Sequence, residues 1–265
     1  MNYLDAFILG LIQGLTEFIP VSSSGHLVIT NYLLGINDGF IYSVLLNFGT
    51  TLALLVYYRK KITEIIARSF RGKEWSLLIK LIVSTIPAVI IGFTFATQIE
   101  SLNVMPWVVI VMLVLVGIIM IKYGQARPDA SDDPIEQSVN YRTAIKVGLA
   151  QAVALIPGTS RSGITILTGL QSKLSASKAA EYSFLLAIPT ILGASLKVFF
   201  FDGGLDFVKS NFGVFLVGNI TSFISGFLAV AFLIKLLSTR GLKDFGWYRI
   251  CLAAVLAILL LSGVI

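Results

Sequence analysis

Long apolar runs separated by short polar segments dominate the pattern of this chain. A helix rises about 1.5 Å per residue, so roughly 20 apolar residues cross a hydrocarbon core of about 30 Å. Runs that approach or exceed this length cover residues 40–58, 75–96, 104–121, 177–201, 208–237 and 245–264. The pattern therefore predicts six transmembrane helices.

Shorter apolar runs form two further pairs, and each pair is interrupted by a proline. The paired runs cover residues 3–19 with 27–34, and 143–156 with 164–170. Each run is short for a full span, and Pro20 and Pro157 interrupt helical structure. We therefore expect two re-entrant helical hairpins, which enter the bilayer and return to the same face.

The composition excludes a water-soluble fold of this size. Hydrophobic residues make up 56% of the 265 residues, and charged residues make up only 13%. So much apolar surface needs a bilayer as its solvent, which predicts an all-α integral membrane protein. The net charge of +6 does not indicate a nucleic-acid partner, because the basic residues lie in short loops between apolar runs. Cys251 is the single cysteine and allows no intrachain disulfide.

The positions of lysine and arginine predict the orientation in the membrane. Basic residues follow the first predicted span and recur in the segments 122–142 and 238–244. We expect these three segments on the cytoplasmic side, which places both termini outside. The first hairpin then enters from the outer face, and the second enters from the cytoplasmic side.

The two hairpins share residues at a constant offset of 138 positions. The residues Ala6, Gly10, Leu11, Gln13, Ser22, Ser24, Gly25 and Thr30 recur as Ala144, Gly148, Leu149, Gln151, Ser160, Ser162, Gly163 and Thr168. We expect a single membrane domain, 1–265, in which repeats of approximately 1–123 and 141–265 are joined by a cytoplasmic linker, 124–140. Each repeat holds one hairpin and three spans, so the topology is inverted. Broken helices from opposite faces then build a site near the midplane.

The break in the first hairpin, residues 13–26, is called the first elbow. Gln13 and Glu17 are four residues apart and share a helix face. The serines 22–24 precede a second half-helix, where a serine N-cap and free N–H groups form an anion site. His26 is the only histidine and can act as base, acid or nucleophile. Ser23 is a rival nucleophile if His26 takes its proton.

The second elbow, residues 156–163, has the same character and adds Arg161, whose forked donors suit phosphate. We expect the two elbows to bind an anionic lipid head group, and glycine at 25 and 163 would let the backbone approach it closely. The diphosphate-binding candidates are Ser22, Ser24, Gly25, Thr159, Ser160, Arg161, Ser162 and Gly163.

A carboxylate beside a phosphate is explained by a divalent cation between them. Mg²⁺ typically takes one or two carboxylates together with phosphate oxygens, and Ca²⁺ is the alternative. Glu17 and Gln13 are the candidate protein ligands of such a cation.

Each of these residues also has a purely structural interpretation. A serine in an apolar helix often bonds the preceding turn, and a single intramembrane histidine can be a structural hydrogen-bonding group. Arg161 could act only as a counter-ion for Glu17. Ionisable residues inside a membrane are nevertheless functional candidates by default, with each other as partners.

The two elbows resemble the undecaprenyl pyrophosphate phosphatase family of bacterial membranes, which is associated with bacitracin resistance. That family has Glu/Gln-x-x-x-Glu running into Pro-Val-Ser-Ser-x-Gly-His, which here reads Gln13 to Glu17 and Pro20 to His26. Its second motif, Pro-Gly-x-Ser-Arg-Ser-Gly, is present as Pro157 to Gly163. The resemblance extends over the full chain.

The resemblance implies hydrolysis of undecaprenyl diphosphate to the monophosphate carrier for cell-wall synthesis, with a divalent metal, on the outer face of the cell membrane. It gives the central roles to Glu17, His26 and Arg161, and leaves open whether Ser23, His26 or a water attacks phosphorus. Position 13 is glutamine where many members have glutamate, so the metal site is one charge poorer. The supporting residues would be Gln13, Ser22, Ser23, Thr159, Ser160 and Ser162.

A transporter or lipid flippase is the competing interpretation, because inverted repeats with broken helices are typical of transporters. A transporter has no use for a nucleophile, an acid and a metal together. The sequence leaves open whether the chain is a monomer or a homo-oligomer.

Overall fold

The computed structural model describes residues 1–36, 39–72, 74–103, 105–125 and 133–263. Over these residues the regular structure is entirely helical, as predicted. The helices long and apolar enough to cross a membrane are α3–α4 (Gly39–Tyr57), α6 (Ser76–Thr94), α8 (Pro106–Tyr123), α12 (Ala176–Phe201), α14 (Phe212–Arg240) and α15 (Lys243–Leu261). The prediction of six apolar spans is confirmed. The expected start of the third span at Val104, the expected end of the sixth span at Val264 and residues 126–132 of the predicted linker lie outside the described residues.

Both predicted hairpins contain a pair of helices separated by a short break. The pairs are α1 (Tyr3–Phe18) with α2 (Ser23–Leu33), and α10 (Tyr141–Val153) with α11 (Arg161–Gln171). Asn2 caps α1 by accepting the Asp5 N–H, and Asn140 caps α10 by accepting the Thr143 N–H. An asparagine cap satisfies one of the backbone donors that a helix start leaves free.

The structure corrects the sequence prediction in two places. The basic segment after the first span is a helix, α5 (Arg59–Arg71), because its charges pair along the helix, with Arg68 Nη2 and Glu64 Oε1 2.6 Å apart. The fifth span begins four residues later than predicted, since 208–210 belong to α13 (Gly204–Ser210). The remaining connecting helices are α7 (Ala96–Asn103) and α9 (Ile135–Ser138).

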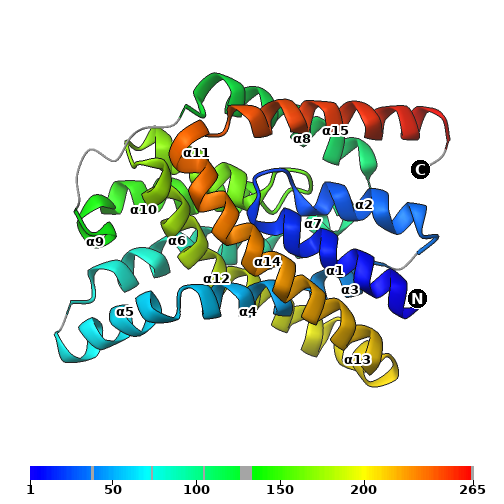
Figure 1. The fold of residues 1–265 in the computed structure, drawn as a ribbon, viewed down its shortest axis with the longest axis horizontal. Coiled ribbons are helices and arrows are strands. Elements are labelled where there is room, and N and C mark those ends of the chain that lie inside the picture. Colours follow the sequence, from blue (N-terminus) through cyan, green and yellow to red (C-terminus); the bar gives the residue numbers. More distant parts are fainter. Residues whose placement is uncertain (37–38, 73, 104, 126–132, 264–265) are drawn as a thin grey trace.

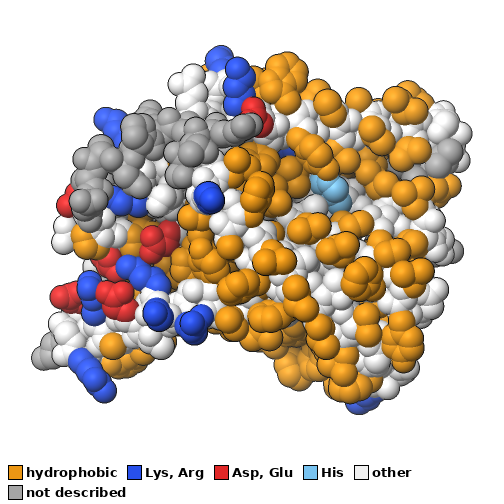
Figure 2. Space-filling view, viewed as in Figure 1, with side chains coloured by type: hydrophobic (Ala, Val, Ile, Leu, Met, Phe, Trp, Pro, Cys, Tyr) orange, Lys and Arg blue, Asp and Glu red, His pale blue; other side chains and the backbone are white. Residues whose placement is uncertain are grey.

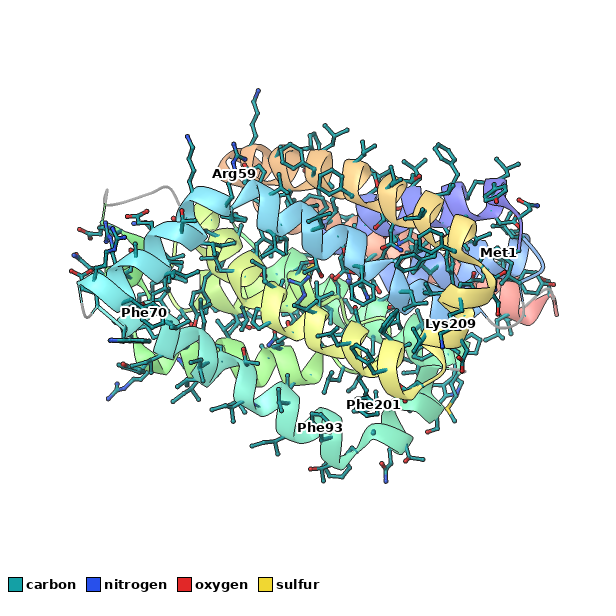
Figure 3. The ribbon with its side chains drawn as sticks, turned by 90° about the horizontal axis from the view of Figure 1, so that it is seen from below. Met1, Arg59, Phe70, Phe93, Phe201 and Lys209 are labelled. Atoms are coloured by element: carbon teal, nitrogen blue, oxygen red, sulfur yellow. The ribbon has the colours of Figure 1, made fainter. Side chains whose placement is uncertain are left out.

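Charged and apolar surfaces occupy different ends of the molecule. Figure 2 shows Lys, Arg, Asp and Glu side chains gathered at the end where Figure 1 places α5 and α9, whereas the rest of the face is mostly apolar. Both chain ends lie at the opposite end (Figure 1). Figure 3 places Met1 and Lys209 at that end and Phe70 at the charged end. The long axis in these views therefore runs from a charged end to the end that holds the termini.

Small residues allow three helix pairs to pack closely: α1 with α14, α6 with α10, and α8 with α15. A Cβ added to Gly10 would collide with the carbonyl oxygen of Gly218, and one added to Gly148 would lie 2.7 Å from the carbonyl oxygen of Ser84. In the third pair, a Cβ on Gly246 would lie 2.7 Å from the Gly117 carbonyl oxygen. Close backbone approach at small residues stabilises helix pairs where lipid supplies no hydrophobic drive.

Gly10→Val is expected to destabilise the protein by about 1–3 kcal/mol, the usual cost of overpacking a close contact. The added side chain would push α1 away from Gly218 of α14. Thermal unfolding in detergent measures the effect. Leu11→Val on the exposed face of α1 is the control and should leave the unfolding temperature nearly unchanged. Equal unfolding temperatures for the two variants would contradict the packing argument.

Candidate active site

The first elbow is shaped by Pro20 and Ser22. A residue before proline favours extended backbone, and Ile19 has φ −65° and ψ 135°, so α1 ends there. Ser22 has φ 73°, a region that non-glycine residues seldom adopt. Its Oγ accepts the Gly25 N–H at 3.3 Å, which makes it the N-cap of α2. The predicted serine cap is confirmed.

The second elbow repeats this geometry. Ser160 has φ 68°, and its Oγ accepts the Gly163 N–H at 3.2 Å as the N-cap of α11. Ser160 and Ser162 share a hydroxyl hydrogen bond of 3.4 Å, as Ser22 and Ser24 do at 3.0 Å. A positive φ at a non-glycine position persists only where its surroundings hold it, and such positions cluster at functional sites.

The two elbows are in direct contact. The Gly158 N–H donates to Ser24 Oγ at 3.1 Å, and the Ser162 hydroxyl donates to the Glu17 carbonyl at 3.2 Å. Gly158 has φ +87°, and a Cβ there would lie 2.6 Å from the Val109 carbonyl oxygen, so this position requires glycine. The contact places the starts of α2 and α11 beside the end of α1.

Glu17 joins the two elbows through its side chain. Its Oε1 lies 3.0 Å from Arg161 Nη2, and its Oε2 accepts the Ser23 hydroxyl at 2.7 Å. The Glu17 and Arg161 side chains are 12% and 13% exposed, so the pair is largely removed from water. Removing one partner of a buried ion pair typically costs about 3–5 kcal/mol, because the other charge is left uncompensated. The counter-ion arrangement considered for Arg161 is therefore present. The bonded side chains of Glu17, Ser23 and Arg161 form what we call the polar cluster.

Two amides extend this cluster. Gln13 Nε2 donates to Glu17 Oε2 at 3.1 Å and to Asn47 Oδ1 at 2.6 Å. Sequence reasoning missed Asn47, although it is the only amide in the first predicted span. Asn47 begins α4 directly after a break at Leu46, whose carbonyl accepts the Ser222 hydroxyl at 2.9 Å. The break thus turns Asn47 toward α1.

Arg161 reaches a further helix as well as Glu17. Its Nη1 donates to the Ser183 carbonyl of α12 at 3.3 Å, and its Nε is buried with no hydrogen-bond partner among the described residues. The Ser183 hydroxyl is 2.6 Å from Thr165 Oγ1 of α11. One donor of the Arg161 fork therefore remains available to a ligand.

His26 faces α15 rather than Glu17. Its Nδ1 lies 2.8 Å from the Ser22 carbonyl oxygen, and its Nε2 lies 2.7 Å from the Tyr248 hydroxyl. The two rings are stacked, with centroids 5.7 Å apart. A carbonyl only accepts, so Nδ1 carries the hydrogen and Nε2 of the neutral ring accepts from Tyr248. Over the described residues, His26 makes no hydrogen bond to Glu17, Ser23 or Arg161, and the Ser23 proton has Glu17 as its acceptor.

Several predicted binding residues have structural contacts that explain them. Thr159 is fully buried, and its hydroxyl donates to the Val153 carbonyl at 3.3 Å. The side of Gly25 that would carry a Cβ faces Val109 and Leu113 of α8, and that of Gly163 faces the Met120 side chain. Glycine at 163 thus makes room for Met120 of α8, whereas a Cβ at 25 would make only ordinary van der Waals contacts.

Helix α15 supplies Tyr248 and Arg249, which sequence reasoning also missed. Arg249 is fully buried, and its Nη2 donates to the carbonyls of Gly158 at 2.7 Å and Met112 at 3.2 Å. The available signal was an arginine inside the last apolar run.

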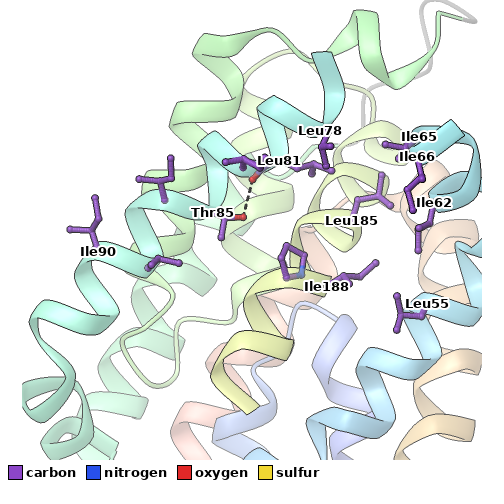
Figure 4. Close-up of a pocket in the computed structure, with 14 residues that line it drawn as sticks. Leu55, Ile62, Ile65, Ile66, Leu78, Leu81, Thr85, Ile90, Leu185 and Ile188 are labelled. Atoms are coloured by element: carbon purple, nitrogen blue, oxygen red, sulfur yellow. Dashed lines mark hydrogen bonds between the residues drawn. The ribbon is translucent and has the colours of Figure 1, made fainter. Parts of the chain in front are cut away.

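An apolar groove of about 610 Å³ lies between α4, α5, α6 and α12 (Figure 4). Thr85 is the only polar residue among the described residues that line it, and its hydroxyl donates to the Leu81 carbonyl at 2.8 Å. The described residues that line it include neither Glu17, Ser23 nor Arg161. The groove is therefore separate from the polar cluster.

The six apolar helices define a multi-pass membrane protein, and its polar cluster lies at two helix breaks. Residues 6–255 match the family described as "Bacitracin resistance protein BacA", and the chain belongs to this family. An undecaprenyl-diphosphatase of Porphyromonas gingivalis is 40% identical over 280 residues, with 100% of this chain and 99% of the relative covered. The undecaprenyl-diphosphatase of Flavobacterium psychrophilum is 38% identical, covering 98% and 96%. That of Lactobacillus delbrueckii subsp. bulgaricus is 36% identical, covering 97% and 98%.

Proposed function

We propose that this protein hydrolyses undecaprenyl diphosphate to undecaprenyl phosphate and inorganic phosphate. Relatives that align with this chain over nearly their full length are named undecaprenyl-diphosphatase. The observation that carries the proposal is the bonding of Glu17, which pairs with Arg161 of one elbow and accepts the Ser23 hydroxyl of the other. That arrangement puts an anion-binding cation beside a hydroxyl whose proton already has an acceptor.

The diphosphate lies at the adjoining starts of α2 and α11. The backbone N–H groups of Ser23, Ser24, Arg161 and Ser162 have no protein partner among the described residues. Helix N-termini bind phosphate through such N–H groups and through the helix dipole. Arg161 adds its unpartnered Nε–H to this set.

Among the three candidate nucleophiles, the geometry favours Ser23. Its oxygen attacks the terminal phosphorus while Glu17 accepts its proton, and the bond from that phosphorus to the lipid monophosphate breaks. A water then attacks this phosphorus, the bond from phosphorus to the Ser23 oxygen breaks, and inorganic phosphate leaves while Ser23 regains the proton held by Glu17. His26 carries a lone pair on Nε2, which lies beside Tyr248 on the other side of the elbow. It acts there as a general acid or base.

A divalent cation, Mg²⁺ with Ca²⁺ as the alternative, is part of the proposal. No cluster of three or more His, Cys, Asp or Glu side chains occurs in the described parts of the chain. The fit therefore rests on Glu17 and the oxygens of the neighbouring Gln13 and Asn47 amides, with phosphate oxygens completing the set. This donor set suits Mg²⁺, and the ion would supply charge neutralisation at the phosphate.

Glu17→Gln is expected to weaken the metal dependence, raising the Mg²⁺ concentration for half-maximal phosphate release by about tenfold or more, because it removes the only carboxylate of the set. The stabilisation of the protein against heat by Mg²⁺ should fall in parallel. Glu64→Gln on exposed α5 is the matched control. An unchanged magnesium curve would rule out Glu17 as a ligand.

The inverted-topology repeat with re-entrant hairpins is also proposed, with both termini and the site opening on the outer face. Its support is that structural details recur at the 138-residue offset: the caps Asn2 and Asn140, and the strained caps Ser22 and Ser160. The pairing of α1 with α14 has its counterpart in α10 with α6. The charged end at α5 and α9 supports a cytoplasmic assignment for that end.

Phosphate release from a polyprenyl diphosphate by purified protein in detergent, with Mg²⁺, tests the function. Release of inorganic phosphate is expected. Failure of release with any divalent metal, together with lipid movement in reconstituted vesicles, would establish the flippase instead.

A further inference from the structure

Arg249 is an isolated positive charge inside the protein. Its side chain is fully buried in α15, and its Nε and Nη1 have no hydrogen-bond partner among the described residues. Nη2 donates only to carbonyl oxygens, and no ion pair to Arg249 occurs over the same residues. A buried charge without a counter-charge is among the most costly features of a protein interior.

The ionised side chains of the elbows, together with Arg249 beside them, carry a net positive charge. Arg161 is neutralised by Glu17 at 3.0 Å, so this pair has no net charge to offer a diphosphate. Among the described residues, Arg249 is the remaining fixed cation that contacts the elbows. It donates to the carbonyl of Gly158, the residue whose N–H bonds Ser24, and its neighbour Tyr248 bonds His26. Its charge therefore lies at the junction of both elbows.

We propose that Arg249 supplies the uncompensated positive charge that selects a diphosphate over a monophosphate. The inference rests on the proposed function. A diphosphate brings more negative charge than the monophosphate lipid that the reaction leaves behind. A unit charge contributes strongly in a site shielded from water, so Arg249 favours substrate binding and lets the less charged product leave.

Arg249→Gln and Arg249→Lys separate charge from hydrogen bonding. Glutamine keeps an N–H donor and removes the charge, whereas lysine keeps the charge. We expect Arg249→Gln to raise KM for the polyprenyl diphosphate about 10- to 100-fold, with a much smaller effect on inhibition by polyprenyl monophosphate. Arg249→Lys should restore most of the loss. Arg142→Gln on exposed α10 is the matched control.

A folded Arg249→Gln protein with wild-type KM, or equal losses for both lipids, would overturn the proposal. Loss of folded protein in both variants would also overturn it, since Arg249 would then be a structural link between α8, α15 and the second elbow. If the wild type releases no phosphate, the proposed function fails, and binding of inorganic pyrophosphate and phosphate by calorimetry decides the inference separately. Weaker pyrophosphate binding by Arg249→Gln alone supports it, and unchanged binding refutes it.

Discussion

Arg161→Ala is expected to abolish phosphate release, with a loss of at least about 10³-fold in kcat/KM while the protein still inserts and folds. The guanidinium belongs to the first residue of α11, where the phosphate is proposed to bind, and donors aimed at developing charge typically contribute factors of this size. The substitution also leaves Glu17 without its partner, so its carboxylate would repel the substrate. Phosphate release, with membrane levels of the protein as reference, measures the effect.

Two companion variants separate these causes. Arg161→Lys keeps the charge but loses the fork that reaches Glu17 and the Ser183 carbonyl together, so it should recover only a small part of the activity. The double variant Arg161→Ala with Glu17→Gln removes both charges and tests repulsion by the stranded carboxylate. If Arg161→Ala instead removes the protein from the membrane, and the double variant restores it, Arg161 is only a counter-ion.

The hydrophobic pattern predicted the helices and the elbows well. Pro20 and Pro157 mark helix breaks that depend on local backbone geometry, and serine caps at Ser22 and Ser160 follow from the same local rules. The length of the apolar runs alone was enough to predict the six spans. The prediction of a loop for the basic segment after the first span was wrong. Charge content says little about helicity when the charges pair along a helix, as they do in α5.

The partners that reach the elbows from elsewhere in the chain could not be predicted in the same way. Asn47, Tyr248 and Arg249 belong to α4 and α15, and their contacts depend on how those helices rotate and pack. The same holds for His26, which follows Ser22 by one helical turn and faces α15 rather than Glu17. Proximity along the chain indicated a shared site but could not distinguish its two sides.

His26→Ala is expected to lower turnover by about 10²- to 10⁴-fold, the usual contribution of a positioned acid or base. Ile164→Ala, at the equivalent position 138 residues later, is the matched truncation and should change turnover by no more than a few-fold. Added imidazole should partly restore His26→Ala, because a small base can occupy the space beside Tyr248. A purely structural histidine would not respond in this way.

Tyr248→Phe divides the role of His26 further. The Tyr248 hydroxyl lies 2.7 Å from His26 Nε2, and its removal leaves the imidazole stacked on the phenyl ring. Turnover should therefore fall about 3- to 30-fold with KM nearly unchanged. This is a smaller loss than that of His26→Ala, since the imidazole itself remains. If both variants turn over substrate within about threefold of the wild type, His26 takes no part in the chemistry, and the proton transfers belong to Ser23 and Glu17.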